Sequence, residues 1–245
     1  MTRKQVALVT GSSSGIGAAI ARRLGAEGMS VVVNAARSVE AGRALAASLP
    51  DARFIRADVS QEADVQALMA RIEEEYGALD LLVNNAGITR PIPHADLTAA
   101  TGDVWREILG VNVVGTWQTT VAAMPLLRGQ GGGHVVNISS VAGVRPAGSS
   151  IPYAVSKAAV NHMTRLLAAT AGPDVRVNAI APGLIDTPWT RTEGFTAIRE
   201  RVRATTPLRR TGTPQDIAEL VVGLHRAAYT TGEVVLADGG AHLLI

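Results

Sequence analysis

The chain has 245 residues, of which 47% are hydrophobic, and it contains no cysteine. Disulfides, thiolate metal sites and cysteine nucleophiles are therefore excluded. With 23 basic residues, 21 acidic residues and only 3% aromatic residues, the sequence shows no basic surface interleaved with aromatics, so we expect no nucleic-acid partner.

The ends and the hydropathy of the chain bear on its location. No apolar stretch approaches eighteen residues, so we predict no membrane span and no membrane partner. Met1–Lys4 leads directly into a strand-like run and leaves no room for a signal peptide, so we expect a cytoplasmic protein. No linker or repeat divides the chain. We predict a single domain over 1–245, with a cofactor half of about 1–130 and a catalytic and substrate half of about 131–245.

Apolar, β-rich runs alternate with helical patterns along the first half of the chain. Four strands are predicted, at Gln5–Thr10, Ser30–Asn34, Arg53–Ala57 and Leu79–Val83. Three helices are predicted between them, at Gly15–Glu27, Val39–Ser48 and Glu62–Tyr76. This alternation is typical of a parallel sheet with helices on both faces.

The alternation continues in the second half. Strands are predicted at His134–Ile138, Val175–Ile180 and Glu233–Ala237, and helices within Asp103–Leu127 and at Tyr153–Ala169 and Asp216–Arg226. The stretch Pro188–Thr206 is polar, arginine-rich and only weakly periodic. Right-handed crossovers would give a doubly wound α/β sheet whose ligand crevice lies at the carboxyl ends of the strands.

A glycine-rich turn, T-G-S-S-S-G-I-G, runs from Thr10 to Gly17 between the first strand and the first helix. In that context backbone N–H groups and the helix dipole can receive the pyrophosphate of a dinucleotide. The spacing G-x-x-x-G-x-G is wider than G-x-G-x-x-G, so a glycine-rich turn that binds nothing is the alternative.

Tyr153 and Lys157 lie four residues apart on one predicted helix face, and Ser140 precedes the tyrosine by thirteen residues. A nearby cation favours the phenolate, so we expect Lys157 to lower the pKa of Tyr153 from its usual value of about 10. Y-x-x-x-K alone fits an ordinary amphipathic helix. Together with Ser140 and the glycine turn, it predicts a proton donor beside a bound dinucleotide.

These motifs resemble those of the short-chain dehydrogenases/reductases, which have a Rossmann-type fold, over essentially the whole chain. Further matching motifs are Asp58-Val59, Asn84–Gly87, Asn112, Pro182–Thr187 and Asp238–Gly240. Within that family the chain is most similar to the 3-oxoacyl-carrier-protein reductases. The resemblance implies an oxidoreductase that transfers a hydride between a nicotinamide and a small-molecule carbonyl or alcohol, including a carrier-protein-bound 3-oxoacyl chain.

The resemblance implies a catalytic set of Asn112, Ser140, Tyr153 and Lys157. Tyr153 would protonate the carbonyl oxygen, and Ser140 would stabilise the charge that develops there. Lys157 would bind the nicotinamide ribose, and Asn112 would hold a water that links Lys157 to solvent. Ser139 is expected to be structural.

The resemblance also implies where the dinucleotide binds. The contacts would be Gly11, Ser13, Ser14, Gly15, Ile16 and Gly17 at the phosphates, Asp58 and Val59 at the adenine, Asn85, Ala86 and Gly87 at the adenosine ribose, Tyr153 and Lys157 at the nicotinamide ribose, and Pro182, Gly183, Ile185 and Thr187 at the nicotinamide amide.

Cofactor choice is predicted from the end of the second strand, Asn34-Ala35-Ala36-Arg37, where Asn34, Ala35 and Arg37 are expected to contact the cofactor. In this fold an acid just past that strand binds both ribose hydroxyls and favours NAD. Here Ala35 stands in its place and Arg37 follows, so a 2′-phosphate would meet an arginine and no carboxylate. We therefore expect NADP(H) to be preferred over NAD(H). Ser14, however, occupies a position that is often basic in NADP-dependent members.

Several alternatives stay open. A catalytically silent, cofactor-binding regulator of the same fold is one, although such proteins usually lack the tyrosine or the lysine. The resemblance implies a homotetramer, with a dimer as the fallback because Thr170 replaces a common glutamate. The arginines between residues 199 and 210 form either a solvated face or a docking surface for an acidic carrier protein. Trp189 either faces substrate or packs in a lid. The histidines show no ligand spacing, so no metal site is expected.

Overall fold

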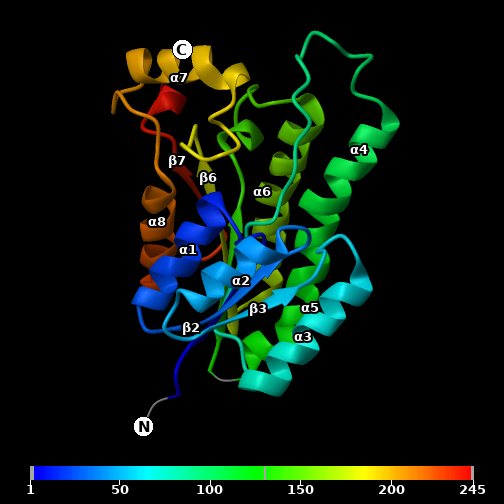
Figure 1. Cartoon of the computed structure of the whole chain (residues 1–245), viewed down its shortest axis with the longest axis vertical. Helices are drawn as coiled ribbons and strands as arrows, with labels where there is room; N and C mark the ends of the chain where they lie inside the picture. Colours follow the sequence, from blue (N-terminus) through cyan, green and yellow to red (C-terminus); the bar gives the residue numbers. More distant parts are fainter. Residues whose placement is uncertain (1–2, 130, 244–245) are drawn as a thin grey trace.

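Apolar runs form the strands because helices cover both faces of the sheet. The computed structural model describes residues 3–129 and 131–243, so only Arg3 and Lys4 of the predicted N-terminal run Met1–Lys4 are described. Seven parallel strands form one sheet in the order β3-β2-β1-β4-β5-β6-β7 (Figure 1). They are β1 Val6–Val9, β2 Ser30–Ala35, β3 Ala52–Arg56, β4 Leu81–Asn84, β5 Gly133–Ile138, β6 Val175–Pro182 and β7 Val234–Ala237.

Helices cover both faces of the sheet. They are α1 Gly15–Ala26, α2 Val39–Ala47, α3 Glu62–Tyr76, α4 Gly102–Leu109, α5 Thr116–Arg128, α6 Ile151–Ala171, α7 Thr196–Thr205 and α8 Pro214–Arg226. Helices α1, α2 and α8 pack on one face, and α3, α5 and α6 pack on the other. The predicted doubly wound parallel sheet, with helices on both faces, is confirmed.

Strand residues alternate between the two cores. Val9 and Val33 pack with α1 and α8, whereas Leu8 and Val32 pack with α3 and α5. All four side chains are fully buried, and burying one such side chain stabilises the fold by about 1.5–3 kcal/mol. Strand order reverses between β1 and β4, which places a crevice at the carboxyl ends of these strands.

Local hydrogen bonds explain where the helix boundaries differ from the sequence prediction. Helix α6 begins at Ile151, two residues before the predicted start, because the Ser150 hydroxyl caps it by accepting the Tyr153 N–H. Helix α8 begins at Pro214 because Thr213 and Asp216 form a capping box. Both starts are set by residues outside the apolar repeat.

Two segments were not predicted in detail. The predicted helical region Asp103–Leu127 consists of α4, a π-helical turn at Gly110–Gly115 and α5. The weakly periodic stretch Pro188–Thr206 contains α7, which lies at the top of Figure 1 and has no buried residue. Within the described residues, no helix is both long and apolar enough to cross a membrane.

Candidate active site

The predicted site residues come from loops that follow the strands. Gly11 follows β1, Asn85 follows β4, Ser140 follows β5 and Gly183 follows β6. Since parallel strands end at one edge of the sheet, these four positions lie along the same edge, as the sequence predicted.

Asn112 lies in the π-helical turn between α4 and α5 and is 1% exposed. Its Oδ1 accepts the Ile88 N–H at 2.8 Å, and its Nδ2 donates to the Ile88 carbonyl and to Ser156 Oγ, each at 3.0 Å. A Cβ atom on Gly87 would lie 3.3 Å from Asn112 Oδ1 and 3.6 Å from Lys157 Nζ. The π-turn therefore brings Asn112 next to Lys157, and the Asn112 amide fixes the loop after β4.

Lys157 is 5% exposed, and its Nζ donates to the Ile138 carbonyl at 2.8 Å. The same Nζ lies 5.8 Å from the centroid of the Tyr153 ring. Burial lowers the pKa of Lys157 to about 8, because desolvation disfavours the ammonium form. The lysine is thus held beside the tyrosine, on the same face of α6.

Tyr153 differs from the sequence prediction in its pKa. Burial raises the pKa of the phenol, and the hydrogen bond with the Ser140 side chain only partly opposes that rise. The expected lowering of the Tyr153 pKa is not met in this structure, because burial of the phenol disfavours the phenolate and raises its pKa. Tyr153 is therefore held in its protonated form, which is the form that can donate a proton.

The two serines after β5 have different surroundings. Ser140 begins a short 3₁₀ turn and its Oγ accepts the Ala142 N–H at 3.2 Å. Ser139 is 3% exposed, and its Oγ donates to the Lys157 carbonyl at 3.1 Å. Ser140 is hydrogen-bonded to the Tyr153 side chain, whereas Ser139 links β5 to α6, as expected for a structural serine.

The glycine turn has the shape that a dinucleotide phosphate requires. Gly11 and Gly15 have φ angles of +60° and +56°, in the left-handed region that favours glycine. A Cβ atom on Gly17 would lie 2.5 Å from Asn85 Nδ2. Ser14 begins α1 without a side-chain cap, and the first turn contains no acid. The backbone N–H groups in the first turn of α1 are therefore not capped by a side chain, and this turn fits a pyrophosphate.

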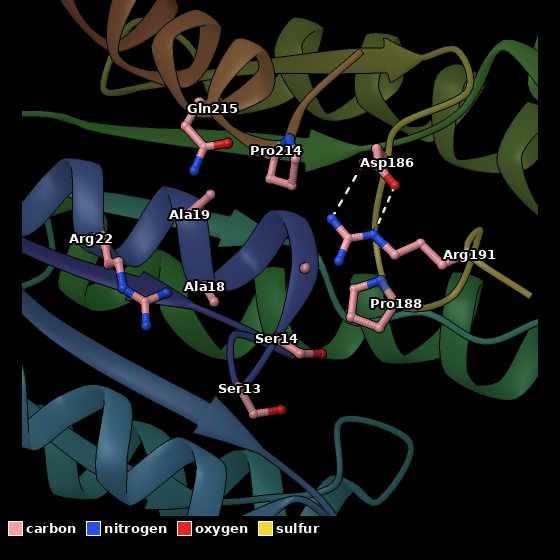
Figure 2. A pocket seen from close by; sticks show the side chains of 11 residues that line it. Ser13, Ser14, Ala18, Ala19, Arg22, Asp186, Pro188, Arg191, Pro214 and Gln215 are labelled. Carbon is pink, nitrogen blue, oxygen red and sulfur yellow. Dashed lines mark hydrogen bonds and ion pairs between the residues drawn. The ribbon is translucent and has the colours of Figure 1, made fainter. Parts of the chain in front are cut away.

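A cavity of about 390 Å³ lies against this turn. One wall is formed by α1 and the other by the segment after β6 and the start of α8 (Figure 2); the lining residues are Ser13, Ser14, Gly15, Ala18, Ala19, Arg22, Asp186, Pro188, Arg191, Pro214 and Gln215. Thr187 stands opposite the glycine turn, since a Cβ atom on Gly15 would lie 3.6 Å from Thr187 Cγ2. The predicted phosphate and nicotinamide contacts therefore face one another.

Two predicted contact residues use their side chains inside the protein. Asn34 is 1% exposed; its Oδ1 accepts the Gly11 N–H at 3.4 Å, and its Nδ2 donates to the carbonyls of Ile55 and Ala57. Asn85 Nδ2 donates to the Thr10 and Gly11 carbonyls at 2.9 and 3.0 Å. Both amides shape the glycine turn, so these side chains are positioning groups.

The other predicted contacts are of mixed character. Ile185 and Val59 are buried, and Ile185 belongs to the core, so these residues can offer a ligand little beyond their backbone. Asp58 Oδ1 accepts both the N–H and the Oγ–H of Ser60. The Gly183 N–H donates to the Ala237 carbonyl at 3.0 Å. Of the other predicted positions, Ile16 lies in the first turn of α1, Ala86 lies in the loop after β4 and Pro182 is the last residue of β6.

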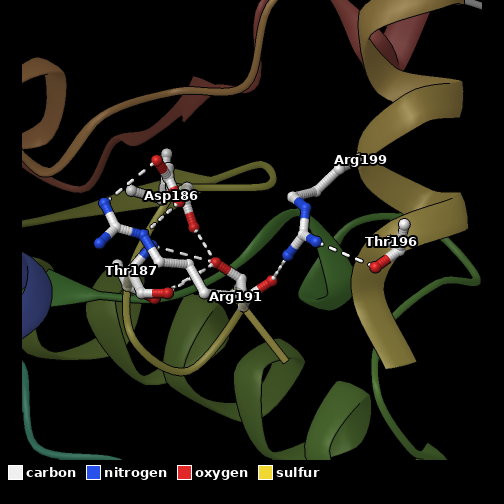
Figure 3. A network of polar contacts seen from close by, with 7 residues as sticks. Asp186, Thr187, Arg191, Thr196 and Arg199 are labelled. Atoms are coloured by element: carbon white, nitrogen blue, oxygen red, sulfur yellow. Dashed lines mark hydrogen bonds and ion pairs between the residues drawn. The ribbon is translucent and has the colours of Figure 1, made fainter. Parts of the chain in front are cut away.

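The segment after β6 is ordered by polar contacts that the sequence did not reveal (Figure 3). Arg191 pairs with Asp186 at 2.9 Å, Thr190 Oγ1 donates to the Thr187 carbonyl at 3.2 Å, and Arg199 donates to the Thr190 carbonyl. Arg199 therefore has an internal partner and is not simply part of a solvated face. The signal that could have found this network is the short spacing of Asp186, Thr187, Thr190 and Arg191.

Trp189 lies beside the tyrosine. Its ring meets the Tyr153 ring edge-on, with centroids 6.0 Å apart and an interplanar angle of 75°. Trp189 is 43% exposed. This placement favours the substrate-facing interpretation over packing in a lid.

Comparison with known proteins agrees with this arrangement. A family model described as Enoyl-(Acyl carrier protein) reductase matches residues 11–242. A curated protein named as ketoacyl reductase 2 of the granaticin polyketide synthase, from Streptomyces violaceoruber, is 69% identical over 98% of this chain and 96% of its own. The short-chain reductase protein NovJ from Streptomyces niveus is 41% identical over 98% of this chain and 95% of its own.

Solved structures give the same result. A short-chain dehydrogenase/reductase structure from Burkholderia xenovorans superposes with a TM-score of 0.91 at 35% identity and covers 100% of both chains. The chain therefore belongs to the short-chain dehydrogenase/reductase family, whose members are oxidoreductases that act on CH–OH and C=O groups with a nicotinamide cofactor.

Proposed function

We propose that this protein is an NADP(H)-dependent carbonyl reductase whose catalytic residues are Ser140, Tyr153, Lys157 and Asn112. The observation that carries the proposal is their convergence at the carboxyl edge of the sheet. There a protonated tyrosine, a buried lysine and a serine hydroxyl lie beside the glycine turn and the first turn of α1, which has no side-chain cap.

The residues divide the work of carbonyl reduction. When bound, the nicotinamide supplies the hydride to the carbonyl carbon. Tyr153 donates its phenolic proton to the carbonyl oxygen, and its raised pKa keeps that proton available at neutral pH. Ser140 donates a hydrogen bond to the same oxygen and stabilises its developing charge. Lys157 holds the ribose and, as an ammonium, stabilises the phenolate that remains.

A 3-oxoacyl thioester is the proposed substrate class. A relative named as a ketoacyl reductase, 69% identical over almost the whole chain, supports this choice. The exposed ring of Trp189 beside Tyr153 offers an apolar contact for an acyl chain. The test is NADPH consumption by the purified protein with a panel of acyl thioesters, ketones and quinones. NADPH binding without turnover on any of them would favour the silent regulator instead.

A carrier protein is the proposed bearer of that substrate. Arg201, Arg203 and Arg209 are exposed near the cavity-lining segment, and such charges steer an acidic partner. Arg199 and Arg210 contribute less, because they bond to Thr190 and Asp216. If the arginines dock a carrier, turnover of carrier-bound substrate falls steeply with salt, while turnover of a free pantetheine thioester does not. Equal salt responses would leave only a solvated face.

A homotetramer is the proposed assembly, with a dimer as the fallback. Three apolar side chains, Val114, Trp117 and Val121, are exposed along the π-turn and α5, and Val155 and Leu166 are exposed on α6. Such contiguous apolar faces are typical of subunit interfaces. We further propose that the chain forms one domain, since a single sheet contains all seven strands from β1 to β7. We also propose that it acts in the cytoplasm. A monomer in light scattering at micromolar concentration would contradict the assembly.

A further inference from the structure

No sequence motif predicts a ligand contact at Arg56. It is the last residue of β3, and the parallel register pairs it with Ala35 at the end of β2. Its Nε donates to the Ala36 carbonyl at 3.2 Å. This bond directs the side chain across the end of β2, toward the turn that contains Arg37.

The two arginines at this turn are not neutralised by the protein. Both are exposed, and within residues 3–129 and 131–243 no carboxylate lies within ion-pair distance of either. Arg53, on the same strand, is different because it lies 3.6 Å from Glu75. Glu40, the acid in the first turn of α2, lies 3.7 Å from Arg43. Two unpaired guanidinium groups therefore remain at the end of β2.

We infer that Arg56 is a second determinant of cofactor specificity, which binds the 2′-phosphate of NADP(H) together with Arg37. The inference rests on the proposed preference for NADP(H). Arg56 would supply a positive charge that Ser14, at a position often basic in NADP-dependent members, does not. A 2′-phosphate is close to a dianion, so two guanidinium groups match its charge. Since the Nε of Arg56 is already bonded to the Ala36 carbonyl, its terminal nitrogens are oriented before a ligand arrives, which lowers the entropic cost of binding.

Calorimetric titration tests this without any turnover. The probes are NADP⁺ and NAD⁺, with 2′,5′-ADP and 5′-AMP as fragments that differ in the same phosphate. We expect Arg56→Gln to raise the Kd of NADP⁺ and of 2′,5′-ADP about tenfold, equivalent to about 1.4 kcal/mol. The Kd of NAD⁺ and 5′-AMP should change less than about twofold, because an ordinary ribose offers no anion to bind.

Arg53→Gln is the matched control, since it removes one positive charge from the same strand without touching the turn. It should leave all four constants unchanged. An unaltered NADP⁺ affinity in Arg56→Gln, or an equal loss for NAD⁺, overturns the inference. If wild type binds NADP⁺ and NAD⁺ equally, the proposed cofactor preference itself is wrong. If the preference disappears in Arg37→Ala but persists in Arg56→Gln, only the role of Arg56 fails.

Discussion

The two edges of the sheet both bury ionisable side chains, but the groups at each edge have different neighbours. At the carboxyl edge, Lys157 and Tyr153 lie side by side next to the glycine turn. At the amino edge, His134 and His225 stack with ring centroids 5.9 Å apart. Burial is the largest cause of the pKa shift at all four side chains: it raises the pKa of Tyr153 and lowers the pKa values of the other three.

At the amino edge, the hydrogen bonds of His134 determine which ring nitrogen carries its proton. Asn178 Oδ1 accepts the Glu233 N–H, so its Nδ2 is the group that faces His134 Nε2 at 3.0 Å. Nε2 is then the acceptor, and the proton of the neutral imidazole sits on Nδ1, which has no partner among the described residues. Arg176 adds a positive charge nearby that further opposes protonation. A shifted pKa therefore does not by itself mark a reaction site.

Replacement of the proton donor should give the largest effect and separate the two edges most clearly. Tyr153→Phe keeps the ring and its contact with Trp189 but removes the transferable proton. We expect kcat to fall by roughly 10²–10⁴, while the Kd of NADPH and the free energy of unfolding stay close to wild type. His134→Gln should instead leave kcat close to wild type and change the free energy of unfolding. Near-normal turnover in Tyr153→Phe would contradict the proposed mechanism.

The pH dependence of the two reaction directions is the next largest effect. Because burial raises the pKa of Tyr153, its phenolate is scarce at neutral pH. Alcohol oxidation, which needs the phenolate as base, should therefore rise about tenfold per pH unit up to about pH 8, whereas carbonyl reduction should stay level. Above about pH 8 Lys157 loses the positive charge that stabilises the phenolate. An oxidation rate that already levels off below pH 7 would show that the tyrosine pKa is lowered, as the sequence first suggested.

Local sequence signals predicted the parts of this molecule that depend on periodicity. Most of the strands are predominantly apolar runs, so their order of appearance and the crevice at their carboxyl ends follow from the pattern. The spacing of Ser140, Tyr153 and Lys157 placed the three side chains together. Tyr153 and Lys157 are four residues apart on one helix, and Ser140 follows a strand that ends at the crevice. Both are local features of the sequence.

Contacts between segments that are distant in sequence could not be predicted in this way. Asn34 and Asn85 were assigned to the ligand, but their amides bond to backbone carbonyls of neighbouring strands and turns. Arg56 was missed because only the register between β2 and β3 places it beside Ala36. The upward shift in the pKa of Tyr153 was also missed, since a sequence gives the spacing of charges but not how deeply a phenol is buried.

Cofactor choice is the third test, at the exposed end of the crevice. A charge-assisted contact contributes about 1.5–3 kcal/mol, so wild type should prefer NADPH over NADH roughly ten- to hundredfold in kcat/KM. Arg37→Ala should lower that ratio, and Ala35→Asp should reverse it, because a carboxylate repels the 2′-phosphate and accepts the ribose hydroxyls. Equal use of both cofactors by wild type would show that this turn does not select the cofactor.

The smallest effect is expected at the amino edge, in the dependence of stability on pH. The folded pKa values of His134 and His225 lie below the unfolded value, so below about pH 6.5 the unfolded chain binds more protons than the folded one. The stability gained from keeping both rings neutral is present above that pH and is lost as the pH falls. Each histidine contributes a slope of up to about 1.4 kcal/mol per pH unit.

Urea unfolding at several pH values between about 7.5 and 5.5 measures this slope. The slope is compared, and not the absolute stability, because a substitution at a buried site lowers the free energy of unfolding by the same amount at every pH. His134→Gln should remove up to one proton from the slope, and His94→Gln, at an exposed position, serves as the control. Activity per folded molecule should be the same in all three proteins. If His134→Gln kept the wild-type slope but shifted the pH profile of turnover, the amino edge would be coupled to catalysis, and the contrast between the two edges would fail.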